Sequence, residues 1–198
     1  MKIQHDQTCV IIVDFQNDSC GVGLGNQEKY QPIIEAVNKT NKLMDVLRKK
    51  GVACIFTKHI EEPNSLPDNL QLLYDNKENL SNGHYTKGQS GSELYGNLIL
   101  PYDLVFEKTL WGAFSNKDLE SYLISKDIKN LIICGAETET CVLSTITEAF
   151  DRGYNIFMPI NCIATKANKI DSHHIPMMEI FNRYYGYVID ESDLLNML

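Results

Sequence analysis

The cysteines of this chain lack the paired spacing that marks disulfide frameworks and zinc sites. No CxxC pair occurs, and the six cysteines are scattered along 198 residues, at positions 9, 20, 54, 134, 141 and 162. Cys9, Cys54 and Cys134 fall in or beside apolar runs, as buried thiols do. The pattern therefore disfavours both kinds of site and predicts a reducing, cytoplasmic location.

Two further absences limit what the protein can bind. Lysine and arginine form no cluster on a predicted helix or loop, and the formal net charge is −8. Because phosphate contacts need a basic surface, we expect no nucleic-acid partner. No apolar run is long enough to cross a membrane, and the N-terminal run is short and ends in an acidic residue. We therefore expect no membrane association and no signal peptide.

The remaining composition is that of a globular protein, with 43% hydrophobic and 22% charged residues. A chain of 198 residues suits one compact domain, so we expect a single domain over residues 1–198. Apolar runs of strand length alternate with segments of helical periodicity. This alternation predicts an α/β fold with three layers, α/β/α, around a central and mostly parallel sheet of Rossmann-like topology.

Residues 8–15 form a continuous β-branched apolar run, typical of a central parallel strand buried on both faces. Further strands are predicted at 52–57, 102–106, 131–134, 154–160 and 187–189. Helices are predicted at 31–50, 116–125 and 171–184, and from Cys141 to Gly153. The polar stretch 61–96 is interpreted as an irregular site wall or lid, and 191–198 as a tail.

Three predicted strands lead to side chains that can do chemistry. Asp14 ends the first strand, Lys108 follows the third, and Cys141 lies where the fourth gives way to a helix. Singly, each has a plain interpretation, as a turn residue, a solvated lysine or a core thiol. Because the ends of parallel strands converge on one crevice, their common position favours a shared site.

The three residue types suit nucleophilic catalysis. A helix N-terminus and the Lys108 ammonium would both lower the pKa of the Cys141 thiol and favour the thiolate. The Asp14 carboxylate would take the thiol proton and pass it to a leaving amine. Backbone N–H groups of Glu137 and Cys141 would receive the oxyanion. No histidine stands at a comparable strand end, which disfavours a Cys–His pair.

Three motifs carry a resemblance to a known family. DFQND at Asp14, FEK at Lys108 and GAETETCVLSTITEAFDRGY around Cys141 resemble, in order and spacing, the isochorismatase-like cysteine hydrolases. These include nicotinamidases, N-carbamoylsarcosine amidases and ureidoacrylate hydrolases. The resemblance implies an Asp-Lys-Cys triad and a cis peptide between Ala136 and Glu137, which turns the Glu137 N–H into the oxyanion hole. It also implies C–N bond hydrolysis in a small amide through a thioester-type intermediate, and a homo-oligomer, dimer or tetramer.

The resemblance raises the question of a metal. Nicotinamidase-like members bind a divalent ion through an Asp-x-His after the second strand and through further histidines. Here Thr57 replaces the aspartate before His59, while His84 matches a further ligand position. Two imidazoles without that carboxylate suit a hard cation poorly, although Glu61 or Glu62 could substitute. We therefore expect no required cofactor and an incomplete metal site, with both histidines hydrogen-bonded in the pocket wall instead.

The predicted pocket suits a small, planar substrate. Trp111, Phe114 and Phe15 would supply a flat apolar wall, Gln16 would orient polar atoms, and Ala136 is counted with this wall. This set does not choose between an aromatic amide and a ureido acid.

Two other classes of function stay open. One is isochorismatase proper, an enol-ether hydrolase that does not need the cysteine as nucleophile. The other is a non-enzymatic redox sensor in which Cys141 is oxidised. A sensor needs the reactive thiol but not the proton shuttle, so the presence of Asp14 and Lys108 disfavours it.

Overall fold

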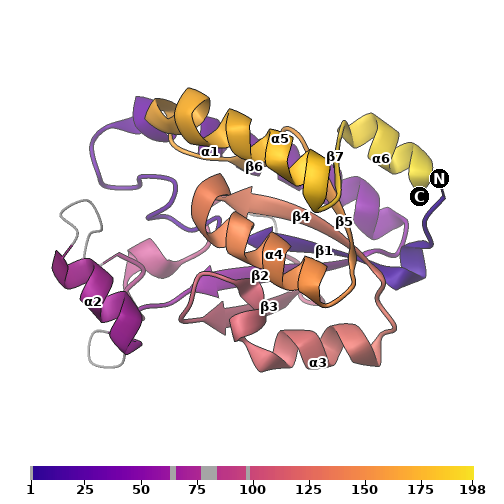
Figure 1. The fold of residues 1–198 in the computed structure, drawn as a ribbon, viewed down its shortest axis with the longest axis horizontal. Helices are drawn as coiled ribbons and strands as arrows, with labels where there is room; N and C mark the ends of the chain where they lie inside the picture. The colour runs from indigo at the N-terminus through magenta and orange to yellow at the C-terminus, as the bar shows by residue number, and fades with distance from the viewer. Residues whose placement is uncertain (1, 63–65, 77–83, 97–98) are drawn as a thin grey trace.

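A parallel sheet with helices on both faces forms the centre of the protein (Figure 1). The computed structural model describes residues 2–62, 66–76, 84–96 and 99–198. The sheet has seven strands, in the order β3-β2-β1-β4-β5-β7, and β6 pairs with β4 beyond the end of β5. All pairs of these strands are parallel. Their bounds are Thr8–Val13 (β1), Ala53–His59 (β2), Leu104–Lys108 (β3), Asn130–Ala136 (β4), Asn155–Pro159 (β5), Ile163–Ala164 (β6) and Tyr187–Ile189 (β7).

The helices complete the three layers. They are Gln27–Lys49 (α1), Asp68–Asn76 (α2), Lys117–Ser125 (α3), Leu143–Asp151 (α4), Ile175–Tyr184 (α5) and Glu191–Met197 (α6). Buried side chains of α1 and α6 pack on one face of the sheet, and those of α3, α4 and α5 pack on the other. The predicted three-layer α/β/α fold is confirmed. None of the described helices combines the length and the apolar character needed to cross a membrane.

The first strand has the central place that its sequence predicts. All six residues of β1 are buried, and β1 lies between β2 and β4. Val10 and Ile12 pack toward α1. Cys9, Ile11 and Val13 pack on the opposite face. Because both faces are covered, the strand has no polar alternation.

The fourth strand is longer than predicted, because Gly135 continues it instead of ending it. Gly135 has a φ of 140° and pairs with Val13 of the neighbouring strand. A Cβ at this position would overlap the backbone of Val13, so only glycine lets the two strands stay this close. The sheet therefore extends to Ala136 and delivers Glu137 to its edge.

Other boundaries differ by a few residues. α1 begins four residues earlier than predicted, and the Asn26 side chain caps it by accepting a hydrogen bond from the Lys29 N–H. β3 is displaced toward the C-terminus, so that Lys108 is its last residue instead of following it. α3 begins one residue later than predicted, and Asn116 caps it by accepting a hydrogen bond from the Asp118 N–H.

Two segments predicted to be irregular contain helices. α2 lies within 61–96, a stretch of which 63–65 and 77–83 fall outside the described residues. α6 occupies the predicted tail, because Leu194 is fully buried against the core. The Ile3 N–H donates to the Met197 carbonyl at 3.0 Å, so the two ends of the chain meet (Figure 1).

Candidate active site

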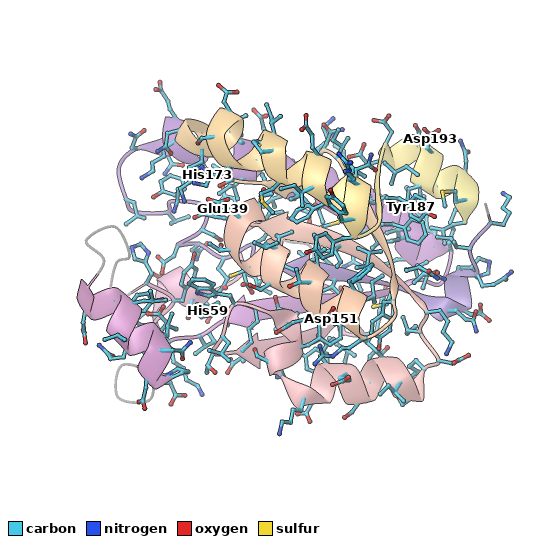
Figure 2. The ribbon with its side chains drawn as sticks, viewed as in Figure 1. His59, Glu139, Asp151, His173, Tyr187 and Asp193 are labelled. Atoms are coloured by element: carbon cyan, nitrogen blue, oxygen red, sulfur yellow. The ribbon has the colours of Figure 1, made fainter. Side chains whose placement is uncertain are left out.

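A cavity of about 310 Å³ lies at the carboxyl ends of the central strands. Asp14, Ala136, Glu137 and Cys141 all line it. In Figure 2, His59 and Glu139 mark this end of the molecule, which α2 also occupies, whereas the opposite end of α4 carries Asp151. The cavity thus has the place expected for a ligand site in an open parallel sheet.

Asp14 and Lys108 form a buried ion pair in this region. The Lys108 Nζ lies 2.6 Å from Asp14 Oδ2 and donates a hydrogen bond to the Leu110 carbonyl at 3.1 Å. The Lys108 side chain is 0% exposed and the Asp14 side chain 3%. Burial lowers the pKa of Lys108, but Asp14 and Cys141 raise it by more, so the net pKa is above the ordinary value. The ammonium therefore stays charged.

Asp14 occupies an unusual backbone position directly after β1. Its φ is +50°, in the left-handed region that aspartate tolerates better than most residues. The Thr57 hydroxyl, fully buried in β2, donates to Asp14 Oδ1 at 2.7 Å. Lys108 and Thr57 thus hold the two carboxylate oxygens in a fixed orientation.

The role of Thr57 is not evident from the sequence, which shows it only in place of a metal-binding aspartate. A signal is nevertheless present. Thr57 is the first polar residue after a buried apolar run, and it pairs with Val13, the neighbour of Asp14. A hydroxyl at that register can reach the end of the adjacent strand.

Cys141 completes the predicted cluster. It lies in the π-helical turn Thr138–Val142, between β4 and α4, where Asp14 and Lys108 both act on the pKa of its thiol. Burial raises the pKa of the thiol; Lys108 lowers it, and Asp14 raises it again. The net pKa lies well above the ordinary value, so the expected lowering acts in the predicted direction but is outweighed. The raised pKa favours a thiol, not a preformed thiolate, as the resting group.

The two predicted oxyanion donors belong to the same turn. The peptide bond between Ala136 and Glu137 is cis, as the resemblance implied. The Glu137 carbonyl accepts hydrogen bonds from the N–H groups of Thr140 at 3.1 Å and Val142 at 3.3 Å. Glu137 and Cys141 are thereby placed together on the cavity wall.

The residues predicted to contact substrate divide into two sets. Trp111 and Ala136 line the cavity. Phe15 and Phe114 are buried in the two core clusters, on opposite faces of the sheet, and do not line it. Gln16 is also fully buried, and its amide donates to the His59 carbonyl at 2.9 Å. These three side chains support the site from behind and do not face it.

His59 and His84 line the cavity in two separate pairs. His59 Nε2 lies 3.3 Å from Glu61 Oε1, the oxygen to which the Tyr74 hydroxyl also donates. His84 Nδ1 lies 3.8 Å from Asp18 Oδ2. Among the residues that the structure describes, no group of three or more His, Cys, Asp or Glu side chains is placed to hold a metal ion. The donors as arranged do not fit a divalent cation.

Two lysines of the cavity wall were not singled out from the sequence. Lys166 and Lys169 follow β6 and form ion pairs with the carboxylate of Glu137. A lysine pair three residues apart is common on protein surfaces, so the sequence offers no distinct signal. Only the pairing of β6 with β4 brings these lysines to residues 137–142, which we call the oxyanion turn.

Comparison with known proteins identifies relatives of this chain. The family described as Isochorismatase domain matches residues 8–193. Ureidoacrylate amidohydrolase RutB of Acinetobacter baylyi is 25% identical, over 99% of this chain and 85% of its own. Nicotinamidase 3 of Arabidopsis thaliana is 25% identical, over 91% and 83%.

The solved structures show the same fold. A cysteine hydrolase from Pseudomonas syringae pv. phaseolicola 1448A superposes with a TM-score of 0.84 at 21% identity, covering 100% of this chain and 94% of that one. Since the family match extends over nearly the whole sequence, and the motifs around Asp14, Lys108 and Cys141 lie within it, the protein belongs to the isochorismatase family.

Proposed function

We propose that this protein is a cysteine hydrolase that cleaves the C–N bond of a small amide-type substrate with Asp14, Lys108 and Cys141 as its triad. Like the amidohydrolase and nicotinamidase among its relatives, it is a hydrolase of C–N bonds other than peptide bonds. One observation carries the triad. Lys108 and Asp14 pair at 2.6 Å, both act on the pKa of the Cys141 thiol, and Asp14 and Cys141 line the same cavity of about 310 Å³.

The first half of the proposed reaction is acylation of the thiol. Cys141 Sγ attacks the amide carbonyl carbon while its proton passes to Asp14, and the carbonyl electron pair moves onto oxygen. The N–H groups of Glu137 and Cys141 stabilise that oxyanion. Asp14 then gives the proton to the leaving nitrogen as the C–N bond breaks, which releases the amine and leaves a thioester.

The second half is hydrolysis of the thioester. Water attacks the carbonyl carbon while Asp14 takes a proton from it. The C–S bond then breaks as Asp14 gives that proton to Cys141 Sγ, which releases the acid product and restores the thiol. Lys108 keeps its charge throughout and holds the carboxylate in place. The raised pKa of the thiol supports this order of events, because deprotonation then accompanies attack instead of preceding it.

Ammonia release tests the proposal. Simple primary amides, ureido compounds and N-carbamoyl amino acids are incubated with the wild type, Cys141→Ala and Cys54→Ala. We expect turnover of at least one class by the wild type and by Cys54→Ala, in which a buried thiol outside the cavity is removed. Cys141→Ala should release none, and intact-mass spectrometry of the wild type should detect the acyl group on Cys141.

Other outcomes point elsewhere. Hydrolysis of an enol ether that survives Cys141→Ala but is lost in Asp14→Asn would indicate isochorismatase chemistry. If no amide turns over and mild peroxide oxidises Cys141 stoichiometrically, a redox sensor explains the site better.

Oligomeric state and location remain proposals. We infer a homo-oligomer, dimer or tetramer, from the family resemblance, and light scattering on the purified chain measures it. A cytoplasmic location is inferred from the unpaired cysteines, all six of which are free thiols. Fractionation of cells that express the protein tests this location.

A further inference from the structure

A cluster of four charged side chains borders the oxyanion turn; we call Glu137, Glu139, Lys166 and Lys169 the rim cluster. Lys166 Nζ pairs with Glu137 Oε1. Lys169 Nζ bridges both acids, 3.1 Å from Glu137 Oε2 and 2.8 Å from Glu139 Oε1. The glutamate side chains are each 11% exposed, against 24% and 31% for Lys166 and Lys169. The cluster is therefore mostly enclosed, not a set of solvated surface charges.

Two sets of contacts hold the segment around β6 against the turn that follows β4. β6 pairs with β4 through Gly135 with Ile163 and Ala136 with Ala164, so the residues after β6 run beside the turn that follows β4. Thr165, fully buried, donates from its hydroxyl to Glu139 Oε1 at 3.1 Å. Lys166 and Lys169 thus reach the turn from the segment that follows the neighbouring strand β6.

The Glu137 carboxylate stands in an unfavourable place for the proposed chemistry. Glu137 raises the pKa of Cys141, although its effect is smaller than those of burial, Lys108 and Asp14. A negative charge here also opposes the oxyanion that would form at the Glu137 N–H. An uncompensated carboxylate would slow both the loss of the thiol proton and the attack.

Lys169 is in the right charge state to compensate it. Burial lowers the pKa of Lys169, but Glu137 and Glu139 raise it by more, so its net pKa is above the ordinary value. Burial raises the pKa of Glu139, but Lys169, the backbone and Thr165 lower it by more. Lys169 and Glu139 are therefore both charged at neutral pH.

We propose that Lys169, assisted by Lys166, is a positioning residue that anchors the oxyanion turn through Glu137 and Glu139 and cancels the charge of Glu137 beside Cys141. Its place in catalysis rests on the proposed function. Its effect on the thiol does not, since that effect can be measured without any amide substrate.

Several titratable groups outside the rim cluster face Cys141 or Glu139. The variants below leave these groups in place. Those that act on Cys141 are Asp14, Lys108, Tyr74 and Tyr85. His174, whose Nδ1 lies 2.8 Å from the Thr138 hydroxyl, acts on Glu139.

The test is the rate of Cys141 alkylation by iodoacetamide from about pH 7 to about pH 10, followed by peptide mapping. The other five cysteines are buried, so Cys141 is the accessible thiol. In Lys169→Met we expect the rate at a given pH to fall about tenfold, which corresponds to one pKa unit. Lys169→Arg should restore it. Lys129→Met removes an ion-paired lysine at the opposite end of β4 and should leave the rate unchanged.

A second variant separates charge from structure. Glu137→Gln keeps the N–H but removes the carboxylate, so the freed lysines should raise the alkylation rate above that of the wild type. In the double variant Glu137→Gln/Lys169→Met the rate should return toward the wild-type value. A merely structural lysine would not be rescued by removing its partner.

Activity assays then connect the cluster to turnover. On any amide that the wild type hydrolyses, Lys169→Met should lower kcat with little change in KM. An alkylation rate in Lys169→Met equal to that of the wild type, or no opposite change in Glu137→Gln, would overturn the proposal. Absence of amide turnover in the wild type would refute the proposed function only, because the alkylation result stands independently.

Discussion

Two lysine–carboxylate systems lie at the cavity, and they differ chiefly in depth. Asp14 and Lys108 are almost completely enclosed, at 3% and 0% exposed, and both act on the pKa of Cys141. In the rim cluster the side chains of Lys166 and Lys169 are 24% and 31% exposed, and each glutamate side chain is 11% exposed. The same charges therefore have different consequences. In the proposed mechanism the deep pair moves a proton, whereas the proposed part of the rim cluster is to shape the field and the backbone around the turn.

Burial also separates what each system does for stability. Taking both charges of the deep pair out of water is costly, and their attraction offsets that cost only while both are present. Water screens the rim cluster more, so each of its contacts contributes little to folding. The following predictions test this contrast, beginning with the largest effect.

The largest effect is expected from Asp14→Asn. The amide keeps the size of the carboxylate but cannot accept the thiol proton, so kcat/KM should fall by about 10²- to 10⁴-fold. Glu139→Gln, the matched change in the rim cluster, should lower it by less than about tenfold. Ammonia release on the same substrate measures both. Equal losses would mean that depth does not distinguish the two acids.

Lys108→Met should destabilise the protein most among the lysine variants. It leaves the buried Asp14 carboxylate without its counter-ion, and the free energy of unfolding should fall by about 3–5 kcal/mol. Lys169→Met should cost less than about 1 kcal/mol. Urea denaturation followed by circular dichroism gives both values.

A double variant is the control for this comparison. Asp14→Asn/Lys108→Met removes both charges and should recover part of the stability that Lys108→Met loses. A double variant that is less stable than Lys108→Met would show that packing of the lysine stem, not its charge, matters.

Thr57→Val should have an intermediate effect. It removes the hydroxyl that donates to Asp14 Oδ1 at 2.7 Å while keeping the β-branched shape. We expect stability to fall by about 1 kcal/mol and kcat by about fivefold, because the carboxylate is less firmly oriented. Thr57→Ser keeps the donor and should retain most of the activity. Loss of activity in both variants alike would refute the hydrogen-bond explanation.

The smallest effect is the pH dependence of the rim cluster. The pKa of Glu139 is lowered in the folded state, so its contribution is complete above its unfolded pKa of about 4.3 and is lost as the pH falls through the folded pKa. The pKa of Lys169 is raised, so its contribution is complete below about 10.4 and is lost as the pH rises through the folded pKa.

Urea denaturation of the wild type and Lys169→Met across this pH range measures the difference. The gap between them should be widest, though under about 1 kcal/mol, between about pH 5 and pH 9, and should close toward both extremes. A gap that grows below the unfolded pKa of glutamate would contradict the assigned charges.

Much of the site could be predicted because a parallel sheet converts sequence order into proximity. Asp14, Lys108 and Cys141 each come at or just after the end of a strand, and strand ends of one sheet edge converge whatever lies between them. Helix ends with local signals were also predictable, as the cap at Asn116 shows. Family membership followed from the motifs around the same three residues.

Other features depend on contacts between distant segments. The sequence predicts that Gly135 ends the strand, but Val13 lies so close to it that glycine continues the sheet there. The sequence predicts a tail for the last residues, but Leu194 is buried in the core. Phe15, Phe114 and Gln16 have suitable side chains for a pocket, but the two phenylalanines are buried in the core clusters and Gln16 hydrogen-bonds to the backbone of β2.

The identity of the reactive side chains and the edge at which they meet were therefore encoded in the linear pattern of apolar runs and polar ends. The state of those side chains was not. Helix position and Lys108 both favour a thiolate at Cys141, yet enclosure raises the pKa of its thiol. The pairing of β6 with β4 brings Lys166 and Lys169 to the Glu137 carboxylate. Strand ends are set by local sequence, whereas desolvation and charge compensation depend on every segment that closes around a group.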